Sequence, residues 1–226
     1  MSMKGSGHAS EWREIDRWEH GVGWLAYPDE TMQRASHAFE VDGEVWIVDP
    51  VDVDGLDDLV TDLGTVAGVV VLLDRHKRDA AAVANRHDVA VHVPEFMSGI
   101  TDDFDAPTTL LHRELGDTGY GVHEIRNNGF WKEAALYDED TDTLVVPESV
   151  GTTSYFRANS ERLGVHPMLR LLPPRKLGRL SPERILVGHG EGIHEGAPAA
   201  LRDAIDSSRS KAPSLYAKTA KEFLLG

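Results

Sequence analysis

Two short polar segments hold the residues that could do chemistry. Residues 74–80 read DRHKRDA and follow the apolar run VVVLL, and residues 188–192 read GHGEG and follow the apolar run ILV. The end of a buried strand is the usual position of a site in an open α/β sheet. Histidine and carboxylate side chains can bind a divalent metal ion there, whereas arginine and lysine can bind anions. For residues 74–80, a solvated loop that caps a helix is the simpler interpretation.

The elements that must position the first segment follow from apolar runs and turn signals. Residues 69–73 predict a buried strand, residues 79–86 predict a helix with Asp79 near its N-terminus, and residues 89–93 predict a second strand. A strand, helix and strand in this order form a βαβ crossover, which implies parallel pairing of the two strands.

Hairpin strands precede this unit and consecutive strands follow it. Residues 37–41 and 44–49 predict a hairpin that turns at Asp42-Gly43, and residues 52–63 predict a short amphipathic helix. From residue 108 the pattern predicts an antiparallel meander, so the fold class is mixed α/β (α+β). The other expected elements are strands over residues 21–27, 110–115, 121–125, 133–137, 143–146 and 185–187, and helices over 155–163, 198–207 and 214–225, with a further helix start at 181–183.

Length and composition limit the class of protein. We expect one domain over residues 1–226, with residues 1–10 as a disordered lead-in, because no Pro/Gly/Ser linker interrupts the chain. The net charge of −15 argues against electrostatic binding of nucleic acid or an anionic membrane. Arginine outnumbers lysine 16 to 7 and aspartate is abundant, a composition typical of proteins adapted to high salt.

The chain contains no cysteine. Disulfides and thiolate ligands are therefore excluded, and any metal must be held by histidine and carboxylate groups. The N-terminus lacks a basic region followed by an apolar core, and no apolar run approaches the ~20 residues of a membrane span. We therefore expect a soluble, cytoplasmic protein.

Taken together, the landmarks between about residue 35 and residue 205 resemble the metallo-β-lactamase superfamily. The matching pieces are EVWIVDP, VVVLL with its charged elbow, AAAVANRHDVAVHVP, LVVPES and ILVGHGEGIHEGAPAALRDAI. The last piece is the most specific, because the family presents a late metal-binding histidine at a Gly-His-Gly turn that follows a strand. The resemblance implies an αββα sandwich of mixed sheets with its site at one edge.

The family's metal motif, T-H-x-H-x-D-H, is altered in this chain. When it is laid on residues 74–80, its first two histidines fall on Arg75 and Lys77, its aspartate falls on Asp79, and its last histidine falls on Ala80. His76 falls on a spacer position. The resemblance therefore implies that a site built from three histidines has been lost.

Three later family positions complete the comparison. The histidine of the family's meander falls near Phe130, and its bridging aspartate falls at Glu148, with Ser149 as the other candidate. The late histidine is kept as His189. Since arginine and lysine cannot ligate a cation, Asp79, Glu148 and His189 remain as ligands for one zinc or other divalent ion. His76 is either a ligand displaced by one position or an exposed loop histidine.

A second arrangement needs no cofactor. Carboxylates of Asp49, Asp79 and Glu148 would converge where the family holds metal, and partly buried charges must be paired. Arg75 and Lys77 could supply the positive charge in a fixed salt-bridge cluster. The full set of predicted pocket residues is Asp49, Asp74, Arg75, His76, Lys77, Asp79, Phe130, Glu148 and His189.

Three functional hypotheses follow. The first is a protein with a degenerate metal site that lacks dizinc hydrolysis and binds a small anionic ligand through its cations. The second is a hydrolase that uses one atypical metal site to activate water. The third is an interaction module, in which the apolar positions of the C-terminal helices pack on a second copy as a homodimer.

The acidic composition gives a first prediction. We expect the melting temperature to rise as salt increases from about 0.1 M toward molar concentrations, because screening over about 10 Å at 0.1 M and about 3 Å at 1 M reduces repulsion within a chain of charge −15. Thermal unfolding followed by circular dichroism at several salt concentrations measures this. A melting temperature that does not increase in molar salt would contradict adaptation to high salt.

Overall fold

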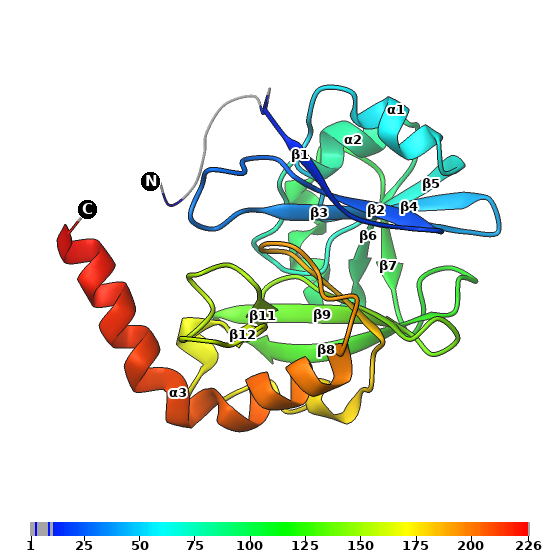
Figure 1. Ribbon diagram of the computed structural model, residues 1–226. Coiled ribbons are helices and arrows are strands. Elements are labelled where there is room, and N and C mark those ends of the chain that lie inside the picture. Colours follow the sequence, from blue (N-terminus) through cyan, green and yellow to red (C-terminus); the bar gives the residue numbers. More distant parts are fainter. Residues whose placement is uncertain (1–2, 4–8, 10, 226) are drawn as a thin grey trace.

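The computed structural model describes residues 3, 9 and 11–225, with side chains described up to residue 221. Two β-sheets lie face to face, two short helices cover the outer face of one sheet, and one long helix covers the outer face of the other (Figure 1). The predicted αββα sandwich of mixed sheets is confirmed. The expectation of a disordered lead-in concerns residues 1–10, most of which lie outside the described residues.

The first sheet has seven strands in chain order. Neighbouring strands are antiparallel from the first to the fourth and parallel from the fourth to the seventh. The predicted hairpin and the parallel βαβ unit are therefore confirmed. The strands are β1 (Arg13–Trp18), β2 (Gly21–Leu25), β3 (Ala35–Val41), β4 (Glu44–Val48), β5 (Thr65–Val70), β6 (Val91–Pro94) and β7 (Thr108–Leu111).

The second sheet has the order β13-β10-β9-β8, and a small sheet pairs β11 with β12. β8, β9 and β10 form an antiparallel meander, whereas β10 and β13 run parallel. These strands are β8 (Tyr120–Asn128), β9 (Trp131–Asp138), β10 (Thr143–Val146), β11 (Val150–Gly151), β12 (Gly164–Val165) and β13 (Arg184–Val187).

Helices cover the outer faces of both sheets. α1 and α2 pack on the first sheet, and α3 packs beside the second (Figure 1). The helices are α1 (Leu56–Thr61), α2 (Ala80–Arg86) and α3 (Ala197–Leu225), and the short 3-10 helices are η1 (Glu95–Asp103), η2 (Pro167–Leu169) and η3 (Leu177–Arg179). Among the described residues, no helix combines the length and apolar character needed to cross a membrane.

Apolar side chains fill the three spaces between these layers. Val69, Val83 and Val91 belong to the cluster under α1 and α2, and Leu144 and Leu201 belong to the cluster that includes buried residues of α3. A third cluster, which lies between the sheets, contains Phe39, Trp46, Val70, Leu72, Leu136, Val145 and Leu186. β-Branched and aliphatic runs such as VVVLL are therefore buried on both faces, as their sequence predicts.

Three local predictions are wrong, and one strand was missed. β7 pairs in parallel with β6 and does not begin the meander. The two helices predicted at the C-terminus are one, because Ala212 and Leu215 are buried on either side of Pro213 and hold the helix together. No helix starts at residues 181–183, whereas β13 confirms the strand expected over residues 185–187. β1 was not expected at all.

The helix predicted over residues 155–163 is also absent, and a buried ion pair shapes that segment instead. The guanidinium of Arg170 donates to both carboxylate oxygens of Glu161 at 3.0 and 2.6 Å, and both side chains are fully buried. Arg170 also donates to the carbonyl oxygens of Phe156 and Val165. These tertiary contacts replace the helical hydrogen bonds that the local sequence would allow.

Residues 71–73 connect the two sheets. The Val71 amide donates to the His92 carbonyl of the first sheet, whereas the Ala134 amide of β9 donates to the Leu72 carbonyl. Leu73 forms a bridge to Glu133 on β9. The chain therefore leaves one sheet and touches the other just before residues 74–80, which places that segment at an edge shared by both sheets.

The buried ion pair yields a stability prediction. Arg170→Met should lower the free energy of unfolding by about 3–5 kcal/mol, because it leaves the buried carboxylate of Glu161 with only the more distant Lys211 at 3.7 Å. Urea denaturation measures the change. The control is Lys176→Met, which removes an exposed pair with Glu124 and should cost at most about 1 kcal/mol. Equal losses in the two variants would show that burial does not decide the strength of these pairs.

Candidate metal centre

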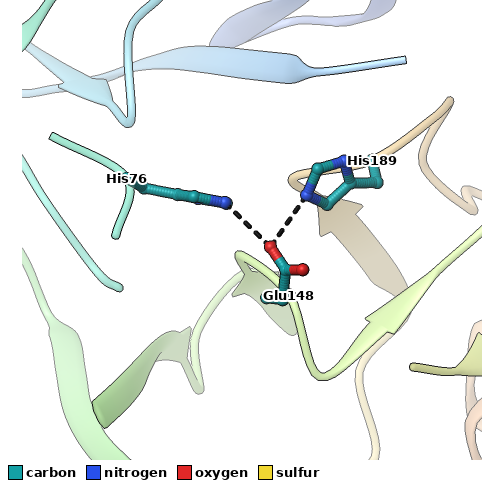
Figure 2. Close-up of side chains that lie close together, drawn as sticks. All are labelled: His76, Glu148 and His189. Carbon is teal, nitrogen blue, oxygen red and sulfur yellow. Dashed lines mark hydrogen bonds and ion pairs between the residues drawn. The ribbon is translucent and has the colours of Figure 1, made fainter. Parts of the chain in front are cut away.

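Three side chains converge at the edge where the sheets meet. Nε2 of His76 and Nε2 of His189 each lie 2.9 Å from the same carboxylate oxygen, Oε2 of Glu148 (Figure 2). All three ligand atoms lie within 4.8 Å of one another, and all three residues are buried. Among the described residues, no other group of histidine and carboxylate side chains meets the same distance test.

The parallel pair β10 and β13 places two of these side chains next to each other. Val146 and Val187 are opposite each other at the ends of these strands, and the Gly188 amide donates to the Val146 carbonyl. A Cβ atom at Gly188 would lie 2.1 Å from the Pro147 carbonyl oxygen, so only glycine permits this close approach. Glu148 and His189 therefore leave adjacent strands within two residues of the paired ends.

His189 is held by the glycine that follows it and by the loop before β3. Gly190 has a φ of +89°, and its amide donates to the Gln33 carbonyl. Nδ1 of His189 lies 2.9 Å from the Met32 carbonyl oxygen, and the residue is only 1% exposed. The two flanking glycines permit a tight turn, and these contacts bury the ring.

His76 turns inward from the elbow that follows residues 71–73. Its amide donates to the Leu73 carbonyl, which makes a tight turn, and its Nδ1 lies 3.1 Å from Oδ2 of Asp49. Asp49 directly follows β4 and has a φ of +46°, and its Oδ1 accepts a hydrogen bond from the Leu72 amide. His76 is thus positioned by a carboxylate from the first sheet.

A third histidine contacts Glu148. Nε2 of His166 lies 3.3 Å from Oε1 of Glu148, and Nδ1 of His166 accepts a hydrogen bond from the Met168 amide. Since Nδ1 of His166 is an acceptor, its neutral ring carries the proton on Nε2 and donates to Glu148. His166 therefore orients the carboxylate and does not offer it a lone pair.

The other two imidazoles, of His76 and His189, carry their proton on Nδ1 instead. The Met32 carbonyl can only accept, so Nδ1 of His189 carries a proton, and the Asp49 carboxylate has the same effect on Nδ1 of His76. In their neutral forms both rings then direct an Nε2 lone pair toward Oε2 of Glu148. Three acceptor atoms, the two Nε2 atoms and Oε2 of Glu148, therefore meet in one place, and they need either additional protons or a cation between them. An Nδ1 held by a carbonyl or carboxylate acceptor is typical of histidines that bind metal.

The electrostatics keep Glu148 charged. Burial opposes ionisation of Glu148, but the charge of His189 and hydrogen bonds from His166, His189 and His76 outweigh it, so the pKa lies well below its ordinary value. Burial lowers the pKa of His189, although the charge of Glu148 opposes that change. Without an ion, the cluster therefore needs protons on the imidazoles to hold Glu148 ionised, and a bound divalent ion would take the place of those protons.

Glu133 supports the turn that carries Glu148. Its Oε1 accepts hydrogen bonds from the Glu148 and Ser149 amides at 3.0 and 2.7 Å, and its Oε2 accepts from the Trp131 indole and the Ser149 hydroxyl. Burial raises the pKa of Glu133, and these hydrogen bonds oppose that rise. Ser149, the other sequence candidate for this position, binds Glu133 and is not a member of the His76, Glu148 and His189 cluster.

Arg75 and Lys77 do not make the contacts expected of a charge-neutralising cluster. Arg75 donates to the Phe130 carbonyl and stacks on the Trp131 ring, with its side chain 44% exposed. Lys77 pairs with Asp103 at 2.7 Å on the surface. The elbow alternates its side chains, so the turn that directs His76 inward directs these two cations outward.

The remaining predicted residues also lie outside the histidine cluster. Asp79 Oδ2 accepts a hydrogen bond from the Asp52 amide, so this carboxylate fixes the loop before α1. Asp74 pairs with Arg75, and the Phe130 side chain is 91% exposed. The predicted ligand set of Asp79, Glu148 and His189 thus differs from the observed cluster in one member, with His76 in place of Asp79.

Sequence reasoning missed two participants. Arg78, with a φ of +41°, donates to the carbonyl oxygens of Ala35, Asp49 and Gly188 and so joins the ends of three strands. His166 lies 18 residues after Glu148 and had no spacing signal. The signal available for Arg78 was only its position in the elbow, because its partners are backbone atoms from distant segments.

Comparisons with known proteins agree with this geometry at the level of the fold. A metallo-β-lactamase named DIM-1 superposes with a TM-score of 0.61 at 13% identity, covering 92% of this chain and 99% of that one. TMB-1 gives 0.59 at 11% identity over 90% and 96% of the two chains. A metallo-β-lactamase from Pontibacter korlensis gives 0.60 at 10% identity over 87% and 99%.

The chain therefore has the metallo-β-lactamase fold. No sequence-family model matches it, and no curated protein matches its sequence. At these identities the likeness establishes the architecture, and the chemistry must be argued from the side chains of the site.

The charge of Glu148 predicts a pH dependence. In chelator-treated protein, Glu148→Gln should lower the free energy of unfolding at pH 7 by about 1–3 kcal/mol, because hydrogen bonds to a charged group are lost. Since the folded-state pKa of Glu148 is depressed, its contribution is present above its unfolded pKa of about 4.3 and is lost as pH falls through the lower folded value.

Urea denaturation between pH 7 and pH 3 measures this difference. The difference in the free energy of unfolding between the native sequence and Glu148→Gln should become smaller below about pH 4.3. The control is Glu183→Gln, which changes an exposed carboxylate and should leave a small, pH-independent gap. A gap for Glu148→Gln that stays constant over the whole range would contradict an ionised Glu148.

Proposed function

We propose that this protein is a metal-dependent hydrolase with a single metal site formed by His76, Glu148 and His189. The observation that carries the proposal is the convergence of two Nε2 atoms and one carboxylate oxygen within 4.8 Å, with both Nδ1 atoms already engaged by acceptors. Two neutral imidazoles and one carboxylate form a donor set suited to zinc and related divalent ions. A divalent ion bound there supplies the Lewis acidity that makes water a nucleophile near neutral pH.

One ion rather than two is supported by the neighbouring residues. Where the family pattern has histidines, this chain has Arg75, Lys77 and Ala80, none of which can ligate a metal. Arg75 and Lys77 also direct their charges to the surface, away from Glu148. A second cation beside the first would therefore lack nitrogen ligands on this side of the site.

The surrounding side chains would prepare the three ligands. Asp49 fixes the ring and tautomer of His76, and the Met32 carbonyl does the same for His189. His166 donates to the second oxygen of Glu148, which leaves Oε2 for the cation. The rings of Phe156 and Trp131 pack on His189 and His166 and exclude water from one side of the site.

A metal-free, non-hydrolytic site is the second candidate, and a specific observation favours it. Glu148 already has three imidazole partners, and its side chain is only 10% exposed, so extra protons on His76 and His189 could satisfy the cluster without an ion. Arg75 and Lys77 stand where the family motif has its first two histidines, which agrees with a degenerate metal site. Metal binding distinguishes the two candidates.

Metal analysis provides the first test. Protein purified without chelator should contain about one divalent ion per chain by mass spectrometry, and titration calorimetry on stripped protein should show one site for zinc. His76→Ala and His189→Ala should abolish stoichiometric binding. Asp49→Asn should weaken binding about 10- to 100-fold, because it removes the hydrogen bond that orients His76.

Two controls make the ligand assignment specific. Asp79→Asn should bind metal normally, since the Asp79 carboxylate accepts a hydrogen bond from the Asp52 amide, and His112→Ala removes a histidine that is exposed at the surface.

Chromogenic lactam, ester and thioester substrates should be hydrolysed by the metal-loaded protein and not by the stripped protein. Absence of metal, together with a melting temperature that does not respond to zinc or manganese, would support the metal-free candidate.

A further inference from the structure

A hollow lies beside the histidine cluster and includes none of its three members. It has a volume of about 380 Å³ and is formed by β1, the loop before β3, the segment after β11 and the turn after His189. Its walls are Arg13, Gln33, Thr152, Arg157, Arg162, Glu191, Gly192 and Ile193. Three of these eight residues are arginines, in a chain whose net charge is −15.

The positive charge in this hollow is only partly neutralised. Arg13 pairs with Glu191 at 2.7 Å, which accounts for the one carboxylate of the lining. Arg162 donates to the Glu195 carbonyl at 2.7 Å, and this contact brings no carboxylate to its charge from the part of the chain that the structure describes. Nε of Arg157 is buried and has no hydrogen-bond partner among the described residues. Arg157 and Arg162 both line the hollow, and the one carboxylate of the lining, Glu191, pairs with Arg13 instead.

The walls of the hollow are fixed by hydrogen bonds. The Arg157 amide donates to the Thr153 carbonyl, and the Arg157 carbonyl accepts from Lys218 on α3 at 2.6 Å. The hydroxyl of Thr152 donates to the Glu191 carbonyl at 2.6 Å, and the Thr152 amide donates to the His189 carbonyl. The arginines thus stand on a backbone that is held in place before any ligand arrives, which reduces the entropy cost of binding.

We propose that this hollow is a binding site for an oxyanion group, a phosphate or carboxylate carried by a small molecule, and that Arg157 and Arg162 are its main contacts. Guanidinium groups bind such planar or tetrahedral oxyanions through paired N–H donors. The site is separate from Arg75 and Lys77, the cations that the sequence favoured for this role.

Binding of simple anions to chelator-treated protein tests the proposal. Titration calorimetry with inorganic phosphate, and separately with malonate as a dicarboxylate, should show saturable binding at low ionic strength. The stronger of the two ligands identifies the class of oxyanion. Arg157→Gln and Arg162→Gln should each weaken binding about 10- to 100-fold, because each removes a charged hydrogen bond.

The controls separate this site from general surface charge and from the metal centre. Arg202→Gln removes an exposed arginine on α3 and should bind phosphate like the native sequence. His76→Ala should also retain phosphate binding, so failure of the metal proposal would leave this result unchanged. Arg162 is exposed, so its variant should fold even if Arg157→Gln does not. The proposal is overturned if neither anion binds, or if Arg162→Gln binds both as well as the Arg202→Gln control.

Discussion

The buried carboxylate of Glu148 is the constraint on which the site depends. A charged carboxylate on a side chain that is only 10% exposed must be compensated. His166 donates to it, and the two Nε2 atoms of His76 and His189 compensate it only with additional protons or with a cation between them and Glu148. Two of these imidazoles have Nδ1 engaged by an acceptor, whereas the third has Nδ1 engaged by a donor. The backbone and Asp49 thereby determine which rings can offer a lone pair and which can only donate a proton.

The meeting of the two sheets explains why these groups can converge at all. β10 and β13 end side by side because Gly188 permits a contact that any side chain would prevent, and residues 71–73 carry the elbow from the first sheet to the second. Arg78 then joins the ends of the contributing strands through carbonyl oxygens. The paired strand ends therefore fix where the three ligand residues lie, and the turns that follow the strands set the directions of their side chains.

The cations of the chain have roles that differ from those expected of a salt-bridge cluster. Arg78 serves the backbone, Arg170 neutralises a fully buried glutamate, and Arg75 packs on an aromatic ring. Arginine suits all three tasks because its planar group donates in several directions and stacks on rings. A motif comparison that considers only charge at aligned positions cannot distinguish these tasks, since each depends on a partner far away in the sequence.

The sequence by itself determined the mixed α/β class, the strand ends at which Glu148 and His189 lie, and the restriction of any ligand set to nitrogen and oxygen. Those features follow from apolar periodicity, glycine positions and composition, which are local properties. Only the tertiary structure decided that His76 rather than Asp79 faces Glu148, that Arg75 and Lys77 face outward, and that His166 approaches from a distant segment. The physical reason is that the direction of a side chain in an elbow is set by hydrogen bonds to the other sheet, and no local pattern encodes those partners.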